Sequence, residues 1–167
     1  MTRLQGLPPV VDAGTRLLVL GSFPGVASLR AQRYYGHPQN AFWKILGVVW
    51  GLPLAQASAA EQQAAALAHG LGIWDVYASC EREGSLDTAI RDPALNDLAG
   101  LRIRCPHLQA IAHNGGESFR HARHTRALGL PVHRLPSTSP ANAGWSFERK
   151  LQAWSEVLAT YGMGAKV

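Results

Sequence analysis

The chain has 167 residues, of which 47% are hydrophobic and 16% charged, and its formal net charge at pH 7 is +5. This length and composition predict one globular domain spanning 1–167 rather than a disordered chain. No apolar run approaches the roughly 20 residues of a membrane helix, and the first 14 residues lack the apolar region of a signal peptide. We therefore expect a cytoplasmic protein without a membrane partner.

Two cysteines, Cys80 and Cys105, are too few for an iron–sulfur cluster and are expected to be free thiols. The charges are unevenly distributed. Residues 1–54 hold five Lys or Arg against one acid, residues 55–100 two against seven, and residues 102–150 eight against two. A basic face suits a polyanion, because neutralised phosphates release counterions. The alternative is that the arginines only keep the protein soluble.

Four apolar segments, at 17–20, 73–76, 108–113 and 131–135, predict buried strands. Helical spacing of apolar residues and end signals predict helices at 41–50, 59–69, 117–128 and 147–161. The polar segment 79–97 is predicted to be a loop, with turns at Gly84 and at Asp92-Pro93. This alternation favours a three-layer α/β/α fold with a central four-stranded parallel sheet, whose crossovers gather the strand-end loops at one edge.

The segment that follows the first strand, GSFPGVASLRAQRYYGHPQNAFW, begins at Gly21 and ends at Trp43. Ligands collect beyond the carboxyl ends of parallel strands, so a site is expected here. Cations suit phosphates, flat rings suit bases, and amides suit base edges. The alternative is a simple Gly-Pro turn with tyrosines packed in the core. The segment lacks G-x-G-x-x-G and G-K-[ST], so neither a dinucleotide fold nor a P-loop is supported.

Metal binding is not expected. His121 and His124 could share a helix face, but no carboxylate or cysteine completes a ligand set, and we predict no cofactor.

Five segments, GSFPG, YYGHPQNAFW, GIWDVYASCEREGSLD, HNGG and LPSTSPAN, occur in this order between residues 21 and 142. Jointly they resemble the motifs of the uracil-DNA glycosylase superfamily. The first two are similar to G-x-N-P-G and F-x-H-P-x-N-x-F-W of its mismatch-specific branch, and the whole set resembles the hypoxanthine-releasing branch more closely. The resemblance implies a monomeric repair enzyme that flips hypoxanthine or uracil out of single- or double-stranded DNA and hydrolyses its N-glycosidic bond, which starts base excision repair.

The resemblance also implies residue roles. Asn40 matches the catalytic asparagine of the hypoxanthine-releasing branch, and Tyr35 the ring that stacks on the flipped base. The implied base pocket comprises Gly21, Ser22, Phe23, Pro24, Tyr35, Ser85, Asp87 and Asn114. The implied DNA contacts are Ser137, Thr138, Ser139, Pro140 and Asn142, in a loop that pinches the backbone and reaches into the stack, with Arg30 and Arg33.

Two positions depart from the family pattern. Phe23 replaces the catalytic Asp or Asn of other branches, and Leu135 replaces a histidine that assists the leaving base. Asn40 cannot take a proton at neutral pH, but its amide can hold a water, and an Asn114 amide could stabilise charge on the departing base. The alternative is that both asparagines only stabilise turns or cap helices. A mismatch-specific uracil or thymine glycosylase and a non-catalytic nucleic-acid-binding module also remain open.

Overall fold

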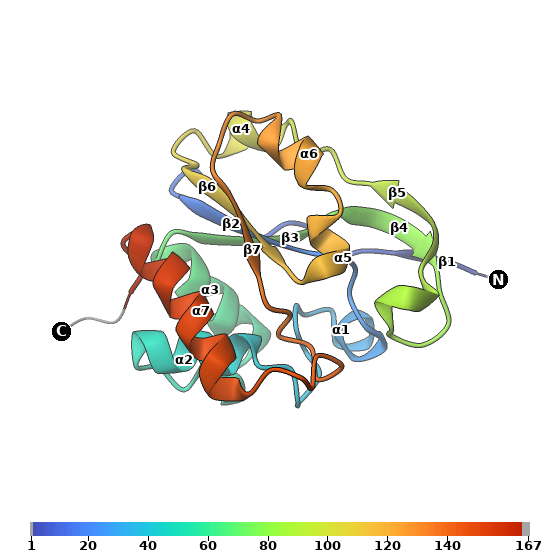
Figure 1. The fold of residues 1–167 in the computed structure, drawn as a ribbon, viewed down its shortest axis with the longest axis horizontal. Coiled ribbons are helices and arrows are strands. Elements are labelled where there is room, and N and C mark those ends of the chain that lie inside the picture. Colours follow the sequence, from blue (N-terminus) through green and yellow to red (C-terminus); the bar gives the residue numbers. More distant parts are fainter. Residues whose placement is uncertain (1, 165–167) are drawn as a thin grey trace.

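The computed structural model describes residues 2–164 and is built on a parallel sheet (Figure 1). Its strands are β2 (Leu17–Gly21), β3 (Leu71–Asp75), β6 (Ala110–Asn114) and β7 (Val132–Leu135), in the spatial order β3-β2-β6-β7. Every residue of β2, β3 and β6 is buried. Strands covered on both faces need near-continuous apolar sequence, which is why these segments were predictable.

Helices cover both faces of this sheet, as the three-layer prediction requires (Figure 1). One face carries α2 (Phe42–Trp50), α3 (Ala59–Ala68) and α7 (Phe147–Thr160), and the other carries α4 (Leu101–Arg104), α5 (Gly116–Phe119) and α6 (Ala122–Arg126). The predicted fold class is confirmed. A short α1 (Val26–Ala31) and two 3-10 turns, Leu54–Gln56 and Asp87–Ala89, lie in the connections.

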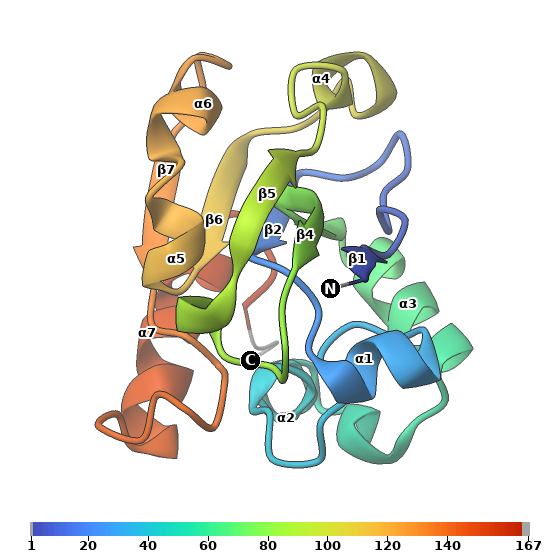
Figure 2. The ribbon, with the colours of Figure 1, turned by 90° about the vertical axis from the view of Figure 1, so that its right-hand side faces the viewer.

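The predicted loop at 79–97 is wrong over much of its length. β4 (Tyr77–Glu81) and β5 (Arg91–Leu95) pair with β1 (Arg3–Gln5) in a second, antiparallel sheet of order β1-β4-β5 (Figure 2). All of β5 is exposed, so it shows no alternation of apolar residues. At Asp92-Pro93 the structure has a register shift in the β4–β5 pairing instead of the predicted turn, and Asp92 has φ +50°. Gly84, with φ +74°, lies in the predicted turn.

The helix predicted at 117–128 is interrupted, because α5 ends and α6 begins around His121. Buried His113 binds the hydroxyl of Ser118 (2.7 Å) through Nδ1 and that of Thr125 (2.8 Å) through Nε2. These side chains tie both short helices to β6. Cys80 and Cys105 are buried and free, as predicted. Among the described residues, no helix is long and apolar enough to cross a membrane.

Candidate functional site

The carboxyl ends of all four parallel strands open into one cavity of about 810 Å³. The last residue of each strand lines this cavity, namely Gly21, Asp75, Asn114 and Leu135. A cavity of this size lies in the range of small-molecule sites. The expected gathering of strand-end loops at one edge is therefore observed.

The floor of the cavity depends on a glycine. A Cβ added to Gly21 would lie 2.5 Å from Oδ1 of Asp75 and 3.1 Å from the hydroxyl oxygen of Tyr35. Tyr35 has φ +54°, a left-handed conformation that is costly for an aromatic residue, and its ring centroid lies 4.1 Å from that of Phe42. Such strain is typical of functional sites.

Asp75 is a cavity residue that the sequence did not lead us to assign to the site. It is 4% exposed, and burial, aided by the negative charge of Asp87, raises its pKa to about 7, although Arg82 acts in the opposite direction. Among residues 2–164, neither Oδ2 of Asp75 nor the hydroxyl of Tyr35 has a hydrogen-bond partner. The signal was available, because a carboxylate closes the apolar run GIWDV at a strand end.

Asn40 lies on the cavity wall, directly before Ala41, which is the N-cap of α2. Its Oδ1 accepts a hydrogen bond from the backbone N–H of Phe42 (3.0 Å), while the N–H of Ala41 donates to the carbonyl of Thr138 (3.0 Å). Within the described chain, the Asn40 amide nitrogen has no protein partner. It is free to bind a water or a substrate atom.

Asn114 joins the sheet to the loop 137–142. Its Nδ2 donates to Oγ1 of Thr138, and its Oδ1 accepts from the N–H of Thr138, both at 3.0 Å. All five predicted residues of this loop line the cavity: Ser137, Thr138, Ser139, Pro140 and Asn142. Thr138 is only 1% exposed, so its side chain has an internal role as well. The Asn114 side chain also interacts with the hydroxyl of Tyr35, and this interaction opposes the rise in the pKa of Tyr35 that burial causes.

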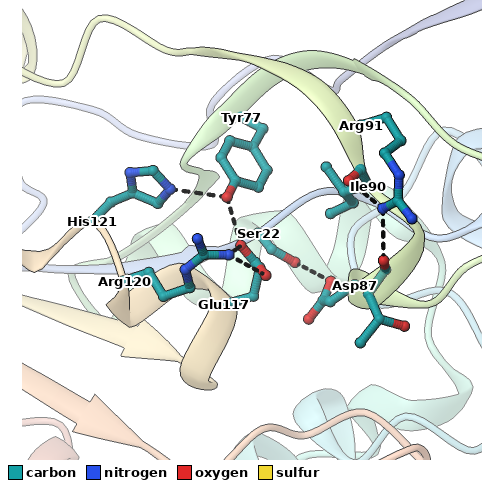
Figure 3. Close-up of polar contacts among 9 residues, drawn as sticks. Ser22, Tyr77, Asp87, Ile90, Arg91, Glu117, Arg120 and His121 are labelled. Atoms are coloured by element: carbon teal, nitrogen blue, oxygen red, sulfur yellow. Dashed lines mark hydrogen bonds and ion pairs between the residues drawn. The ribbon is translucent and has the colours of Figure 1, made fainter.

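The turn after β2 and the loop between β4 and β5 also contribute to the cavity wall. Ser22 donates from Oγ to Oδ1 of Asp87 (2.6 Å) (Figure 3). Ser85 accepts at Oγ from the N–H of Val26 (2.9 Å). Partial burial of its carboxyl group raises the pKa of Asp87, while the Ser22 bond opposes this shift. Phe23 and Pro24 also line the cavity, and the Arg82 guanidinium lies 5.4 Å from the centroid of the Phe23 ring. All eight predicted pocket residues are thus brought together.

The cluster around Tyr77 anchors α5 beside this wall (Figure 3). Tyr77 donates to Oε2 of Glu117 (2.7 Å), and its hydroxyl oxygen lies 2.9 Å from Nε2 of His121. Arg120 adds an ion pair of 3.0 Å with Glu117. Because the Tyr77 proton goes to Glu117, His121 is the donor in the second contact. No group of three or more potential metal ligands occurs in the described part of the chain.

The two arginines predicted to bind DNA differ. Arg33 donates to the carbonyl of Ala57 (2.8 Å) and to Oε1 of Gln62 (2.9 Å), so its guanidinium has an internal role. Arg30 is exposed on α1. Trp145 is another cavity residue that the sequence reasoning missed. The guanidinium carbon of Arg149 lies 4.1 Å from the centroid of its ring.

Comparison with models of protein families identifies the family of this chain. Residues 8–158 match the model described as the uracil DNA glycosylase superfamily. The chain belongs to this superfamily. The predicted family is therefore confirmed, and the segments singled out in the sequence all lie within the matched range.

Comparison with individual proteins shows which members of the superfamily are similar to this chain. The chain is 38% identical over 152 residues to a protein named hypoxanthine DNA glycosylase from Methanosarcina barkeri, with 91% of this chain and 96% of the relative covered. A protein of the same name from Methanosarcina acetivorans is 39% identical over 154 residues, covering 92% and 96%. The solution NMR structure of a uracil DNA glycosylase candidate from Methanosarcina acetivorans has a TM-score of 0.86 at 34% identity, covering 96% of this chain and 99% of that one. The predicted resemblance to the hypoxanthine-releasing branch is confirmed.

Proposed function

We propose that this superfamily member is a DNA glycosylase that releases hypoxanthine from DNA by hydrolysing the bond between the base and the deoxyribose. The observation that carries the proposal is the cavity at the four strand ends, where the amide nitrogen of Asn40 has no partner among residues 2–164. Relatives that share 38% and 39% identity over more than nine-tenths of the chain carry the name of this activity.

The reaction breaks the C1′–N9 bond of deoxyinosine and adds the oxygen of water to C1′. The electron pair of the broken bond stays with the base, which takes up a proton. Because the sugar becomes cation-like before water attacks, a strong base is not required, and a positioned water suffices. Asn40 can hold this water through its free amide N–H and the remaining lone pair of Oδ1.

Groups on the cavity floor can stabilise the departing base. The side-chain amide of Asn114 can donate to a carbonyl or ring nitrogen of the base, since such donors stabilise charge that develops in the transition state. Asp75, whose pKa is raised to about 7, is partly protonated at neutral pH and can donate as well. Tyr35, with its ring on the cavity wall, can stack against the flipped base.

A panel of end-labelled DNA tests the proposal. Duplexes and single strands containing one hypoxanthine, one uracil or one thymine mismatch are incubated with the protein, treated with alkali and resolved on a gel. We expect strand cleavage at hypoxanthine. Cleavage at uracil or mismatched thymine alone would indicate the mismatch-specific activity instead, and binding of all substrates without cleavage would indicate a non-catalytic module.

Two further measurements on the active protein test the expectations about cofactor and oligomeric state. Activity is expected to persist after treatment with EDTA, since no metal or cofactor is proposed. Sedimentation of the active protein with substrate is expected to show one copy of the chain. Loss of activity on chelation, restored by added metal, would contradict the first expectation.

A further inference from the structure

A second cavity, of about 310 Å³, lies where the first turns of α2 and α7 contribute to one wall. Both helices cover the same face of the parallel sheet (Figure 1). The residues that line this second cavity are Gln39, Ala41, Lys44, Phe147 and Lys150. Two of these side chains are cations and none is an acid, so the second cavity has the charge of an anion-binding site.

Lys150 is buried although it carries a charge. It is 6% exposed, and its Nζ donates to the carbonyl oxygen of Ser139 (3.3 Å). No carboxylate oxygen lies within 4.0 Å of this nitrogen among residues 2–164. An ammonium group has three N–H donors, and burying it without a counter-ion is costly, which lowers the pKa of Lys150. An anion in the second cavity would supply the missing charge and the missing acceptors.

Lys44 is the other cation of the second cavity. It is exposed on the first turn of α2, so its ammonium group can reach a ligand that arrives from solvent. Two ammonium groups that line one cavity repel each other, and an anion bound between them removes this repulsion. Gln39 is also exposed and can add an amide N–H. Lysine and amide donors are the groups that proteins direct at phosphate oxygens.

The second cavity is connected to the proposed active site at two points of the chain. Gln39 and Ala41 flank Asn40, which lines the cavity at the strand ends. Ser139, whose carbonyl is bound by Lys150, lines that cavity as well. A ligand held in the second cavity is therefore held next to the nucleotide whose base occupies the first.

We propose that the second cavity binds a backbone phosphate of DNA, close to the flipped nucleotide and on the same strand. This inference rests on the proposed glycosylase function. Phosphate contacts fix the position of a protein on DNA without reading the sequence. A phosphate bound by Lys44 and Lys150 would hold the strand in register while its base occupies the cavity beside Asn40.

Neutral phosphates locate the contact. Strands with one 2′-fluorodeoxyinosine, whose fluorine destabilises the cation-like sugar and so prevents cleavage, are made with a single uncharged methylphosphonate at each neighbouring position in turn. For the wild type, we expect one position near the modified nucleotide at which the methylphosphonate weakens binding several-fold. At this position Lys44→Gln should cause no further loss, whereas it should weaken the binding of the other strands, because two changes that remove the same contact are not additive.

The salt dependence gives an independent measurement. Lys44→Gln is expected to lower the slope of log affinity against log salt by about 0.9 on duplex DNA and about 0.7 on the single strand, as for one phosphate contact. Lys44 is exposed, so the variant should melt like the wild type. Arg104→Gln is the matched control, because it removes one exposed charge on α4, at the opposite end of the molecule from α2 (Figures 1 and 2). It should leave both results unchanged.

Three outcomes would overturn the proposal. These are no loss of affinity in Lys44→Gln, an equal loss at every methylphosphonate position, and a loss on duplex but not on the single strand, which would place the contact on the other strand. All of these measurements report binding and do not depend on cleavage. A position-specific loss in a protein that cleaves no DNA of the panel would contradict the glycosylase function alone.

Discussion

The side-chain oxygen of Asn40 accepts a hydrogen bond from the backbone N–H of Phe42 at 3.0 Å. The N-cap of α2 is Ala41, but the bond from Asn40 satisfies one of the free donors at the start of the helix, as a capping side chain does. The amide nitrogen of Asn40 stays available to the cavity. The two interpretations of this asparagine, cap and catalytic group, are therefore compatible, and a single substitution should affect stability and chemistry separately.

Asn40→Ala is expected to lower single-turnover excision by roughly 10² to 10⁴-fold, the range for loss of a positioned polar group. It should also cost about 1 kcal/mol of unfolding free energy, a few degrees in melting temperature, because the bond to Phe42 is lost. DNA affinity should change little. Cleavage assays, calorimetry and fluorescence anisotropy measure the three quantities.

Asn40→Asp is the control, since a carboxylate can still accept from Phe42 and still orient water. It should melt like the wild type and retain more activity than Asn40→Ala. An alanine variant that melts early but cleaves at the normal rate would leave Asn40 as a cap only, and Asp75 or Asn114 would then become the candidate for water positioning.

Gly21→Ala tests the packing of the cavity floor. The new methyl group would lie 2.5 Å from Oδ1 of Asp75, so the carboxyl and the Tyr35 ring must move. We expect a loss of about 1–3 kcal/mol in stability, as for other overpacked sites, together with weaker excision. Gly144→Ala serves as the control because, apart from Gly144 and its two chain neighbours, no atom of residues 2–164 lies within 4 Å of the added Cβ. Wild-type melting and cleavage in Gly21→Ala would show that the floor is not tightly packed.

The parallel sheet was predictable because β2, β3 and β6 are buried throughout and are therefore rich in apolar residues. β4 and β5 were not, because exposed Arg91–Leu95 shows no apolar alternation and its pairing partner β4 was itself read as loop. The break between α5 and α6 depends on His113 binding Ser118 and Thr125, and such a tertiary contact leaves no periodic signal.

The candidate site was largely predictable because parallel strands end at one edge, so residues after each strand meet in space. What the sequence could not show is the direction of individual side chains. Arg33 and Arg30 are three residues apart, yet only Arg33 reaches Ala57 and Gln62. The position of Asp75 at a strand end was visible in the sequence, but its burial beside the cavity was not.

The pH dependence of stability should reflect two buried groups with opposite effects. Burial raises the pKa of Asp75 from 3.8 to about 7, so its contribution is fully present below about pH 4 and is lost as the pH rises to about 7. Burial, together with the charges of His121 and Arg126, lowers the pKa of His113 from 6.5 to about 4. Its contribution is present above pH 6.5 and is lost as the pH falls to about 4.

Asp75→Asn removes one of these opposing effects and should reveal the other. The variant is expected to be more stable than the wild type above pH 7, by a few kcal/mol at most, and to lose stability steadily from pH 6.5 to 4. The wild type should show a flatter profile in this window. Melting temperatures from pH 4 to 8 measure both curves, and parallel curves would contradict the assignment of a raised pKa to Asp75.

Arg30 and Arg33 form a matched pair, because the sequence predicts that both bind DNA. Arg30 is exposed, and we expect it to neutralise a phosphate, whereas the Arg33 guanidinium is bound to Ala57 and Gln62. Each neutralised phosphate contributes about 0.9 to the slope of log affinity against log salt. Arg30→Gln should therefore lower this slope by about 0.9 without changing the melting temperature. Arg33→Gln should leave the slope unchanged but cost about 1–2 kcal/mol of stability, because the acceptors of Arg33 lose a charged donor. Duplex binding from 50 to 300 mM salt, about a sixfold range, measures the slopes. The reverse outcome, a lower slope only in Arg33→Gln, would show that Arg33 leaves its internal partners to bind DNA.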